Sequence, residues 1–165
     1  MAVISNIDIS IKAQESGSGS LATIFANHSD VYSAAYPSGT SASTADMVYS
    51  ISATTSTTTP VAYDLAGSLT GALGNTLTFA KIVAIYVINN STTAADILTV
   101  GAGSNPLLNW IIATGDGVKV GAGGAFFISA PIAPFSVTAG TGDVLTLTSA
   151  SGSIPYKLIV IGRSA

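Results

Sequence analysis

Short runs in which apolar and polar residues alternate constrain the fold of this chain more than any other feature. Ile7, Ile9 and Ile11 alternate with polar residues, and residues 144–148 read VLTLT. A period of two indicates β-strands with one buried face. Two denser segments, IVAIYVI and KLIVI, are rich in β-branched residues. Such segments predict strands that are buried on both faces.

Turn-forming residues separate these runs at intervals of roughly 8–15 residues. The intervening clusters are rich in Gly, Asn, Asp and Ser, as at 71–75, 121–124 and 139–143. Glycine allows positive φ angles, and the short polar side chains hydrogen-bond within turns. Short strands between regular turns are typical of an antiparallel all-β sandwich, and we expect about eight strands between residue 60 and the C-terminus.

Residues 1–45 differ from the rest and predict an N-terminal strand or arm with Ser/Gly/Thr-rich linkers. One strand is expected at Ile4 to Lys12, and a Gly/Ser-rich stretch follows at 15–20. The pattern of residues 21–36 is ambiguous. This composition suits an arm or strand pair that becomes ordered on a partner, and it equally suits a hairpin that packs on the chain's own sandwich. The sandwich domain is expected to cover residues 46–165.

The chain is short of charge for its apolar content. Only 8% of its residues are charged and 48% are apolar, whereas an ordinary soluble domain carries about 25% charged residues. Copies of the same chain or another partner normally cover a surface so poor in charge. We therefore expect an assembly protein that forms a homo-oligomer, either a dimer or a trimer.

Charge and hydropathy also argue against two other classes of partner. Nucleic-acid binders need clustered cations, but the five Lys and Arg residues are scattered and the net charge is −3. No apolar run approaches the ~20 residues that a membrane-spanning helix requires. The N-terminal sequence MAVISNIDISIK lacks the basic region of a secretory signal. We expect no direct nucleic-acid or membrane partner and maturation in the cytoplasm.

Candidate catalytic and metal-binding residues are scarce. Residues 28–30 (His-Ser-Asp) are the one place where a serine-type triad could be assembled, but no GxSxG motif is present. Asp96, Asp116 and Asp143 sit at turn-to-strand junctions. They either cap their own turns or converge at one end of the sandwich to bind calcium. We expect no enzymatic activity and no cofactor.

Three aromatic residues are candidates for contacts. Trp110 lies between two Gly-rich turns, where it either closes one end of the sandwich or is exposed to stack on a sugar or anchor an interface. Phe126 and Phe127 are adjacent, so in a strand they point to opposite faces. The one that leaves the core is a candidate subunit contact.

Several segments resemble small structural proteins of tailed bacteriophage virions. They are Tyr63–Thr70 (YDLAGSLT), Gly74–Ile82 (GNTLTFAKI), Thr138–Leu145 (TAGTGDVL) and Ile159–Gly162 (IVIG). The resemblance covers roughly residues 45–165. It implies a jelly-roll protein of the capsid decoration or cement type, located on the capsid surface of the virion and partnered by the major capsid protein.

Two functions follow as expectations. In the first, the chain binds and stabilises the assembled capsid shell, with the strand Ile7 to Ile11 joining a partner by strand addition. The alternative is a tail-tip or fibre-associated module that binds a receptor or carbohydrate, with Trp110 and Tyr86 as stacking faces. The candidate capsid or subunit contacts are Ile7, Ile9, Ile11, Trp110, Phe126 and Phe127.

Overall fold

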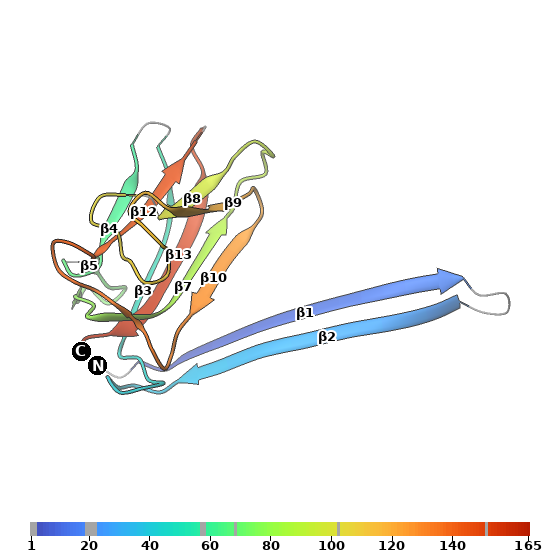
Figure 1. Cartoon of the computed structure of the whole chain (residues 1–165), viewed down its shortest axis with the longest axis horizontal. Coiled ribbons are helices and arrows are strands. Elements are labelled where there is room, and N and C mark those ends of the chain that lie inside the picture. Colours follow the sequence, from blue (N-terminus) through green and yellow to red (C-terminus); the bar gives the residue numbers. More distant parts are fainter. Residues whose placement is uncertain (1–2, 19–22, 57–58, 68, 102, 151) are drawn as a thin grey trace.

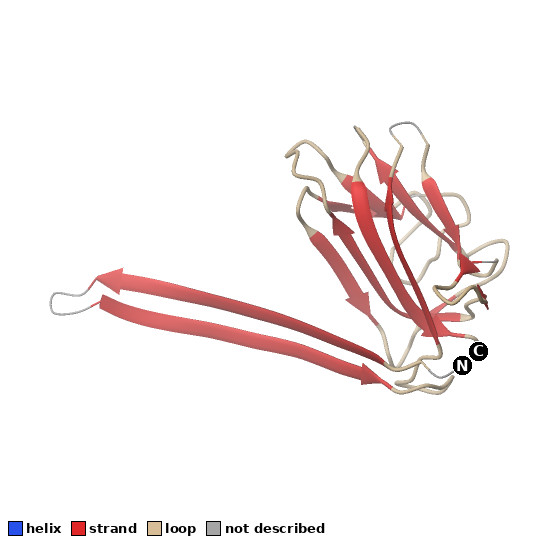
Figure 2. Cartoon of the chain, turned by 180° about the vertical axis from the view of Figure 1, so that it is seen from behind, coloured by secondary structure: helices blue, strands red, loops and turns tan. Residues whose placement is uncertain are grey.

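A computed structural model describes residues 3–18, 23–56, 59–67, 69–101, 103–150 and 152–165. In these residues the protein contains thirteen β-strands and no helix. Two parts stand out in Figures 1 and 2, a β-sandwich and a long N-terminal hairpin that projects from one end of it. The predicted all-β antiparallel sandwich with an N-terminal extension is confirmed.

The sandwich consists of two main antiparallel sheets. The arm-side sheet has the order β10-β7-β13-β3, and β11 also pairs with β7. Its strands are β3 (Met47–Thr54), β7 (Lys81–Asn89), β10 (Ala125–Ser129), β11 (Phe135–Ser136) and β13 (Pro155–Arg163). The far sheet has the order β4-β12-β8-β9. Its strands are β4 (Val61–Asp64), β8 (Leu98–Gly101), β9 (Gly117–Val120) and β12 (Val144–Ser149).

The strand count exceeds the expectation. Ten strands follow residue 60 in the described part of the chain, whereas about eight were expected. Three of the ten are only two residues long, namely β11 and the separate pair β5 (Leu69–Thr70) and β6 (Thr76–Leu77). Such short pairings have no alternation of their own for a sequence pattern to reveal.

The main core lies between the two sheets. Ile85 and Leu158 of the arm-side sheet and Leu98, Leu145 and Leu147 of the far sheet are fully buried in it. Full burial of one such side chain stabilises the fold by about 1.5–3 kcal/mol. The two sheets are therefore held together mainly by apolar side chains that alternate inward along each strand.

The two densest apolar strands are buried on both faces along only part of their length. In β7, Ile82 to Ile85 are all buried, but Tyr86 and Ile88 are half-exposed. In β13, Val160 to Arg163 are all buried, but Lys157 and Ile159 are half-exposed. The prediction of strands buried on both faces is correct at one end of these strands and wrong at the other, because the hairpin covers one end only.

The hairpin, which we call the arm, consists of β1 (Ser5–Ser18) and β2 (Thr23–Tyr36). The strands pair antiparallel from Ser5 with Tyr36 to Ser18 with Thr23. Fourteen residues at about 3.3 Å each give a length of about 45 Å. The base of the hairpin packs on the chain's own sandwich, as one of the two alternatives expected, and the rest projects from it (Figure 1). Ordering of the arm on a partner stays a prediction. Glu15 to Ser18, expected as a linker, belong to β1.

Candidate functional site

The arm has one apolar and one polar face near its base. Residues directly opposite in an antiparallel pair share a face, so Ile7 lies beside Ala34 and Ile9 lies beside Tyr32. We call this side, which also carries Ile11, the inner arm face. Farther out, the same face bears the charged or titratable residues Asp30, His28 and Glu15. The inner arm face therefore changes from apolar to charged along its length.

The opposite side, the outer arm face, is mostly polar. The Ser33 hydroxyl donates a hydrogen bond to the Asp8 carboxylate at 2.6 Å, and the Gln14 amide donates to Asn27 at 2.8 Å. Val31 and Phe25 are exceptions on this face, with 58% and 57% of their surfaces exposed. Cross-strand hydrogen bonds of this kind stabilise a hairpin by fractions of a kcal/mol, so the outer arm face adds only modestly to the stability of the arm.

The base of the arm packs on the outer face of the arm-side sheet and forms a second small core. Its buried members are Tyr36, Ala45, Val83, Ala84 and Ile161. Ile7 and Ala34 of the arm pack against this cluster. The Tyr36 and Ser129 hydroxyls are hydrogen-bonded at 2.9 Å, and burial raises the pKa of Tyr36. The arm is thus rooted by apolar packing and by a tyrosine hydrogen bond.

Arg163 holds together the segments around this root. Its side chain is only 3% exposed. The guanidinium donates through Nε to the Thr44 carbonyl at 2.9 Å and through Nη2 to the Pro131 carbonyl at 2.6 Å. Hydrogen bonds from a charged donor contribute about 1.5–3 kcal/mol. They tie the segment that follows the arm to the connection between β10 and β11.

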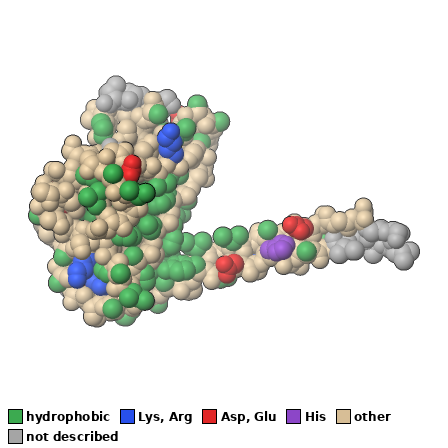
Figure 3. Space-filling model, viewed as in Figure 1, with side chains coloured by type: hydrophobic (Ala, Val, Ile, Leu, Met, Phe, Trp, Pro, Cys, Tyr) green, Lys and Arg blue, Asp and Glu red, His purple; other side chains and the backbone are tan. Residues whose placement is uncertain are grey.

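An apolar notch lies where the arm diverges from the sheet. Its volume is about 300 Å³, and its lining consists of Asn6, Ile7, Asp8, Ile9, Tyr86, Phe127, Ile159 and Ile161. The rings of Tyr32 and Phe127 lie 5.8 Å apart between its two walls. Figure 3 shows hydrophobic side chains along both walls of the angle between sandwich and arm. The notch thus presents apolar surface from two separate parts of the chain.

The outer faces of the two sheets differ in character. On the arm-side sheet, the outer side chains beyond the arm's base include Tyr86, Ile88 and Ile159, all half-exposed. On the far sheet, the corresponding positions include Thr99 and Lys119. A solvated antiparallel sheet normally presents polar side chains outward. Only the arm-side sheet departs from that pattern.

The structure brings part of the predicted contact set together. Ile7, Ile9 and Phe127 line the notch. Ile11 lies farther out on the inner arm face, where it is 66% exposed. Tyr86, expected only as a stacking face for a sugar, is in the notch. Sequence reasoning missed Ile159, although its alternation with buried Leu158 and Val160 could have identified it.

Two predicted contacts belong instead to the main core. Phe126 faces inward, and its ring lies 5.5 Å from that of Trp110. The indole nitrogen of Trp110 donates to the Leu107 carbonyl at 2.8 Å. Both side chains pack against the core cluster. The expectation that one of the two adjacent phenylalanines leaves the core is confirmed, and it is Phe127 that does so.

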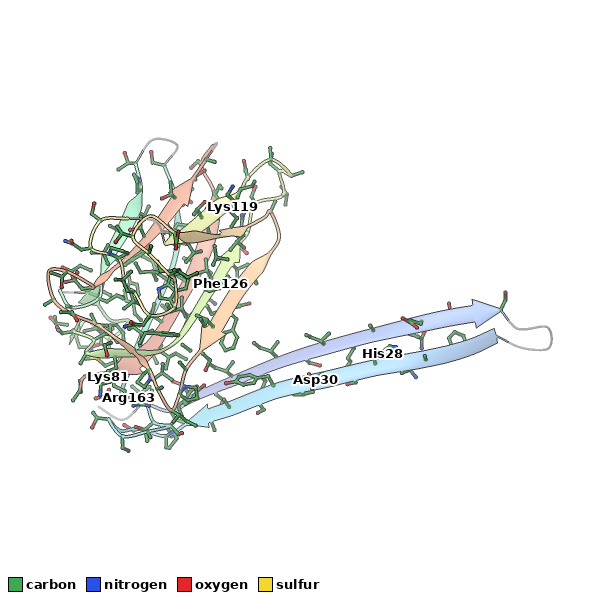
Figure 4. All side chains as sticks on the ribbon, viewed as in Figure 1. His28, Asp30, Lys81, Lys119, Phe126 and Arg163 are labelled. Atoms are coloured by element: carbon green, nitrogen blue, oxygen red, sulfur yellow. The ribbon has the colours of Figure 1, made fainter. Side chains whose placement is uncertain are left out.

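His28, Ser29 and Asp30 do not form a catalytic triad with one another. His28 lies 3.9 Å from Glu15, and both side chains are well exposed on the arm (Figure 4). Ser29 pairs with Lys12, whereas His28 pairs with Ala13, so the serine and histidine side chains lie on opposite faces. This arrangement does not place a serine hydroxyl beside an imidazole base, which nucleophilic catalysis requires.

The three junction aspartates each accept a hydrogen bond within their own turn. Asp96 accepts from the Ser91 hydroxyl at 2.6 Å, Asp116 from the Ala113 amide at 2.8 Å, and Asp143 from the Gly140 amide at 2.5 Å. Asp96 and Asp143 precede the antiparallel neighbours β8 and β12 and so lie at opposite ends of them. The calcium alternative, in which all three converge, is wrong. Within the described ranges, no group of three His, Asp or Glu side chains could hold a metal ion.

Neither a membrane-spanning helix in the described residues nor a related protein identifies a family for this chain. The described residues form no helix that is long and apolar enough to span a membrane. Comparison of the chain with protein-family models, curated proteins and solved structures gives no significant match. The resemblance to phage virion proteins therefore stays a prediction.

Proposed function

We propose that this chain is a non-enzymatic structural protein of a phage virion, of the capsid decoration or cement type. The observation that carries this proposal is the arm, which extends about 45 Å and bears an exposed apolar inner face. Only 8% of the residues are charged, so charged side chains do little to offset the cost of exposing this apolar surface to water. An assembled partner that covers the arm would remove this apolar surface from water.

The strand pairing supports the jelly-roll part of the proposal. Eight strands form four nested pairs along the chain: β3 with β13, β4 with β12, β7 with β10, and β8 with β9. Rolling up one long hairpin would produce this nesting, which supports a jelly roll, a two-sheet, eight-stranded arrangement that occurs in viral capsid proteins. The fold by itself does not specify the function.

The mechanism is thermodynamic. A chain that binds the assembled shell but not free shell subunits stabilises the shell by mass action. Many symmetric copies add avidity to weak single contacts.

The strand from Ile7 to Ile11, expected to join a partner by strand addition, is already paired with β2. In the described residues, β1 and β2 pair only with each other. Strand addition therefore has to use an outer edge of the hairpin.

Immunogold electron microscopy of purified virions, with antibody against this chain, tests the proposal. Label distributed over the head is the expected result. Label confined to the tail tip would replace the proposal with the receptor-binding alternative. Absence of label from every particle would contradict both virion functions.

A shortened arm tests the route of binding. Replacing residues 13–28 with Asn-Gly joins Lys12 to Ser29 through a two-residue hairpin turn. The base of the arm keeps Ile7, Ala34 and Tyr36 on the sandwich. We expect the shortened chain to lose saturable binding to virions from which the native protein has been stripped. Full saturation by the shortened chain would show that the part of the arm beyond Lys12 is not the contact, since Ile7, Ile9 and Ile11 remain in this variant.

The receptor-binding alternative is weakened by the position of its main residue. The ring of Trp110 lies 5.5 Å from that of Phe126 in a tilted contact and packs against the core, so it is not a free platform for a sugar.

A further inference from the structure

Two apolar surfaces of the chain flank the notch, and both keep partly exposed side chains. On the arm, Ile11 is 66% exposed and Tyr32 is 41% exposed. On the arm-side sheet, Tyr86, Ile88 and Ile159 are half-exposed. Contiguous exposed apolar surface is rare on monomers and marks interaction sites. The two surfaces therefore need an occupant.

We infer that the occupant is a second copy of this chain. In this arrangement the inner arm face of one copy packs on the exposed part of the arm-side sheet of the other copy, and the reverse contact forms at the same time. Such a reciprocal contact uses the same patch on both subunits and closes a two-fold dimer. This inference concerns the purified chain and does not depend on the proposed function.

The strongest support is continuity with packing already present inside each copy. The base of the arm already binds this sheet, with Ile7 and Ala34 against Val83, Ala84 and Ile161. The exposed residues extend the apolar surface of the arm on one side and that of the sheet on the other. On either strand they recur at every second residue, about 7 Å apart. The apolar residues on the exposed part of the sheet are thus spaced like those on the part of the arm beyond its base.

The chain's own arm leaves the outer side of the arm-side sheet partly exposed at Tyr86, Ile88 and Ile159. Figure 4 shows Asp30 and His28 on the arm well away from the sandwich. Ile11 is the cross-strand partner of Asp30 and therefore lies out on the arm as well. The exposed part of the sheet is consequently free to receive an arm from elsewhere.

Charge complementarity favours a second copy over an unrelated apolar partner. The two arm strands carry three acidic side chains, Asp8, Glu15 and Asp30, and one basic side chain, Lys12. The strands of the arm-side sheet carry Lys81, Lys157 and Arg163 and no acidic residue. Lys157 is half-exposed on the outer face, beside Ile88. Arg163 is buried at the root of the arm, so Lys157 is the cation that this part of the sheet presents outward. Asp30 and Glu15 on the inner arm face of one copy would thus meet Lys157 on the other copy, which favours this pairing over a contact between like charges.

Analytical ultracentrifugation of the full chain tests the inference with two matched variants. Ile11→Thr removes apolar surface from the inner arm face, and Val31→Thr does the same on the outer arm face at similar exposure. We expect the wild-type chain to dimerise, Ile11→Thr to weaken dimerisation at least tenfold because the contact occurs twice, and Val31→Thr to leave it unchanged. A wild-type chain that is monomeric at every concentration, or equal effects of the two variants, would overturn the inference.

The absence of cysteine from the chain permits a direct test of the contact. One tagged chain carries Ile11→Cys and a differently tagged chain carries Ile88→Cys. Under mild oxidation we expect disulfide-linked heterodimers above the level obtained when Val31→Cys replaces Ile11→Cys. Equal yields from the two mixtures would overturn the arm-to-sheet arrangement.

Experiments can distinguish failure of the dimer inference from failure of the proposed decoration function. A monomeric chain that still labels virion heads would overturn self-association and leave the decoration function standing. A dimeric chain that labels no particle would do the opposite.

Discussion

The sandwich and the arm are built from the same alternation of apolar and polar residues, but they use it differently. In the sandwich, alternate side chains such as Ile85 and Leu158 are sealed between two sheets. In the arm, Ile11 follows the same period but has no second layer above it. An isolated two-stranded hairpin is marginally stable in water. The two regions therefore differ in burial: the apolar side chains of the sandwich are sealed in a core, whereas those of the arm beyond its base stay exposed.

The largest expected difference between the two regions comes from deletion of one isoleucine side chain. Ile85→Ala creates a cavity in the main core and should lower the free energy of unfolding by about 2–5 kcal/mol. Ile11→Ala in the dilute monomer should change it by less than about 0.5 kcal/mol, as for other surface positions. Urea denaturation of both variants checks this pair. Similar losses of unfolding free energy in the two variants would contradict the claim that the core, and not the arm, stabilises the fold.

A buried tyrosine pair sharpens the account of the sandwich. The hydroxyls of Tyr63 and Tyr156 are hydrogen-bonded to each other in the core. Tyr63→Phe should cost about 1–3 kcal/mol because it leaves a buried hydroxyl without its partner. Adding Tyr156→Phe should recover part of that loss, since no unpaired hydroxyl then remains. A double-mutant cycle from urea denaturation measures the coupling, and strictly additive losses would contradict it.

Alkaline pH should weaken the sandwich through the same residues. Burial raises the pKa of Tyr49, Tyr63 and Tyr156, so the folded chain keeps these protons to a higher pH than the unfolded chain, whose tyrosines titrate near pH 10. Stability should be constant with respect to these groups below about pH 9 and should fall as the pH rises beyond about 10. Urea midpoints measured from pH 8 to 11 check this. The double phenylalanine variant should show a shallower decline, and an equal decline would exclude the pair as its cause.

Shortening the arm should have the smallest effect on stability. Replacement of residues 13–28 with Asn-Gly removes no member of either core cluster. The free energy of unfolding of the dilute chain should change by less than about 0.5 kcal/mol. Thermal denaturation followed by circular dichroism checks this, with the full-length chain as reference. A large loss would show that the outer arm supports the sandwich within one copy.

The sequence predicts the strands of the sandwich better than it predicts the surface that the arm faces. Alternation alone identifies Ile7, Ile9 and Ile11 as one face of a strand. It does not reveal β2, because residues 23–36 place small and polar residues at many of the apolar positions. The run from Ile82 to Ile88 gives no sign of where its outer face becomes exposed, since that depends on how far the arm's base reaches. Long-range packing decides this.

The adjacent phenylalanines illustrate the same limit. Because successive side chains in a strand point to opposite faces, one of the two must face outward, but the sequence does not say which. The pairing of Phe127 with Tyr86, whose side chain lies in the notch, places Phe127 on the outer face. Trp110 was ambiguous for a related reason, because only the tertiary fold brings its ring onto Phe126.

Hydrogen exchange of the chain, free at monomeric dilution and bound to virions, tests the central claim most directly. The account predicts slow exchange of β7 and β13 amides in both states, because these strands are paired on both sides within the sandwich. It predicts rapid exchange of the arm amides beyond Ile11 in the free chain and strong protection of them in the bound chain. Arm amides that exchange as rapidly in the bound chain as in the free chain would contradict the claim that the arm is built for assembly.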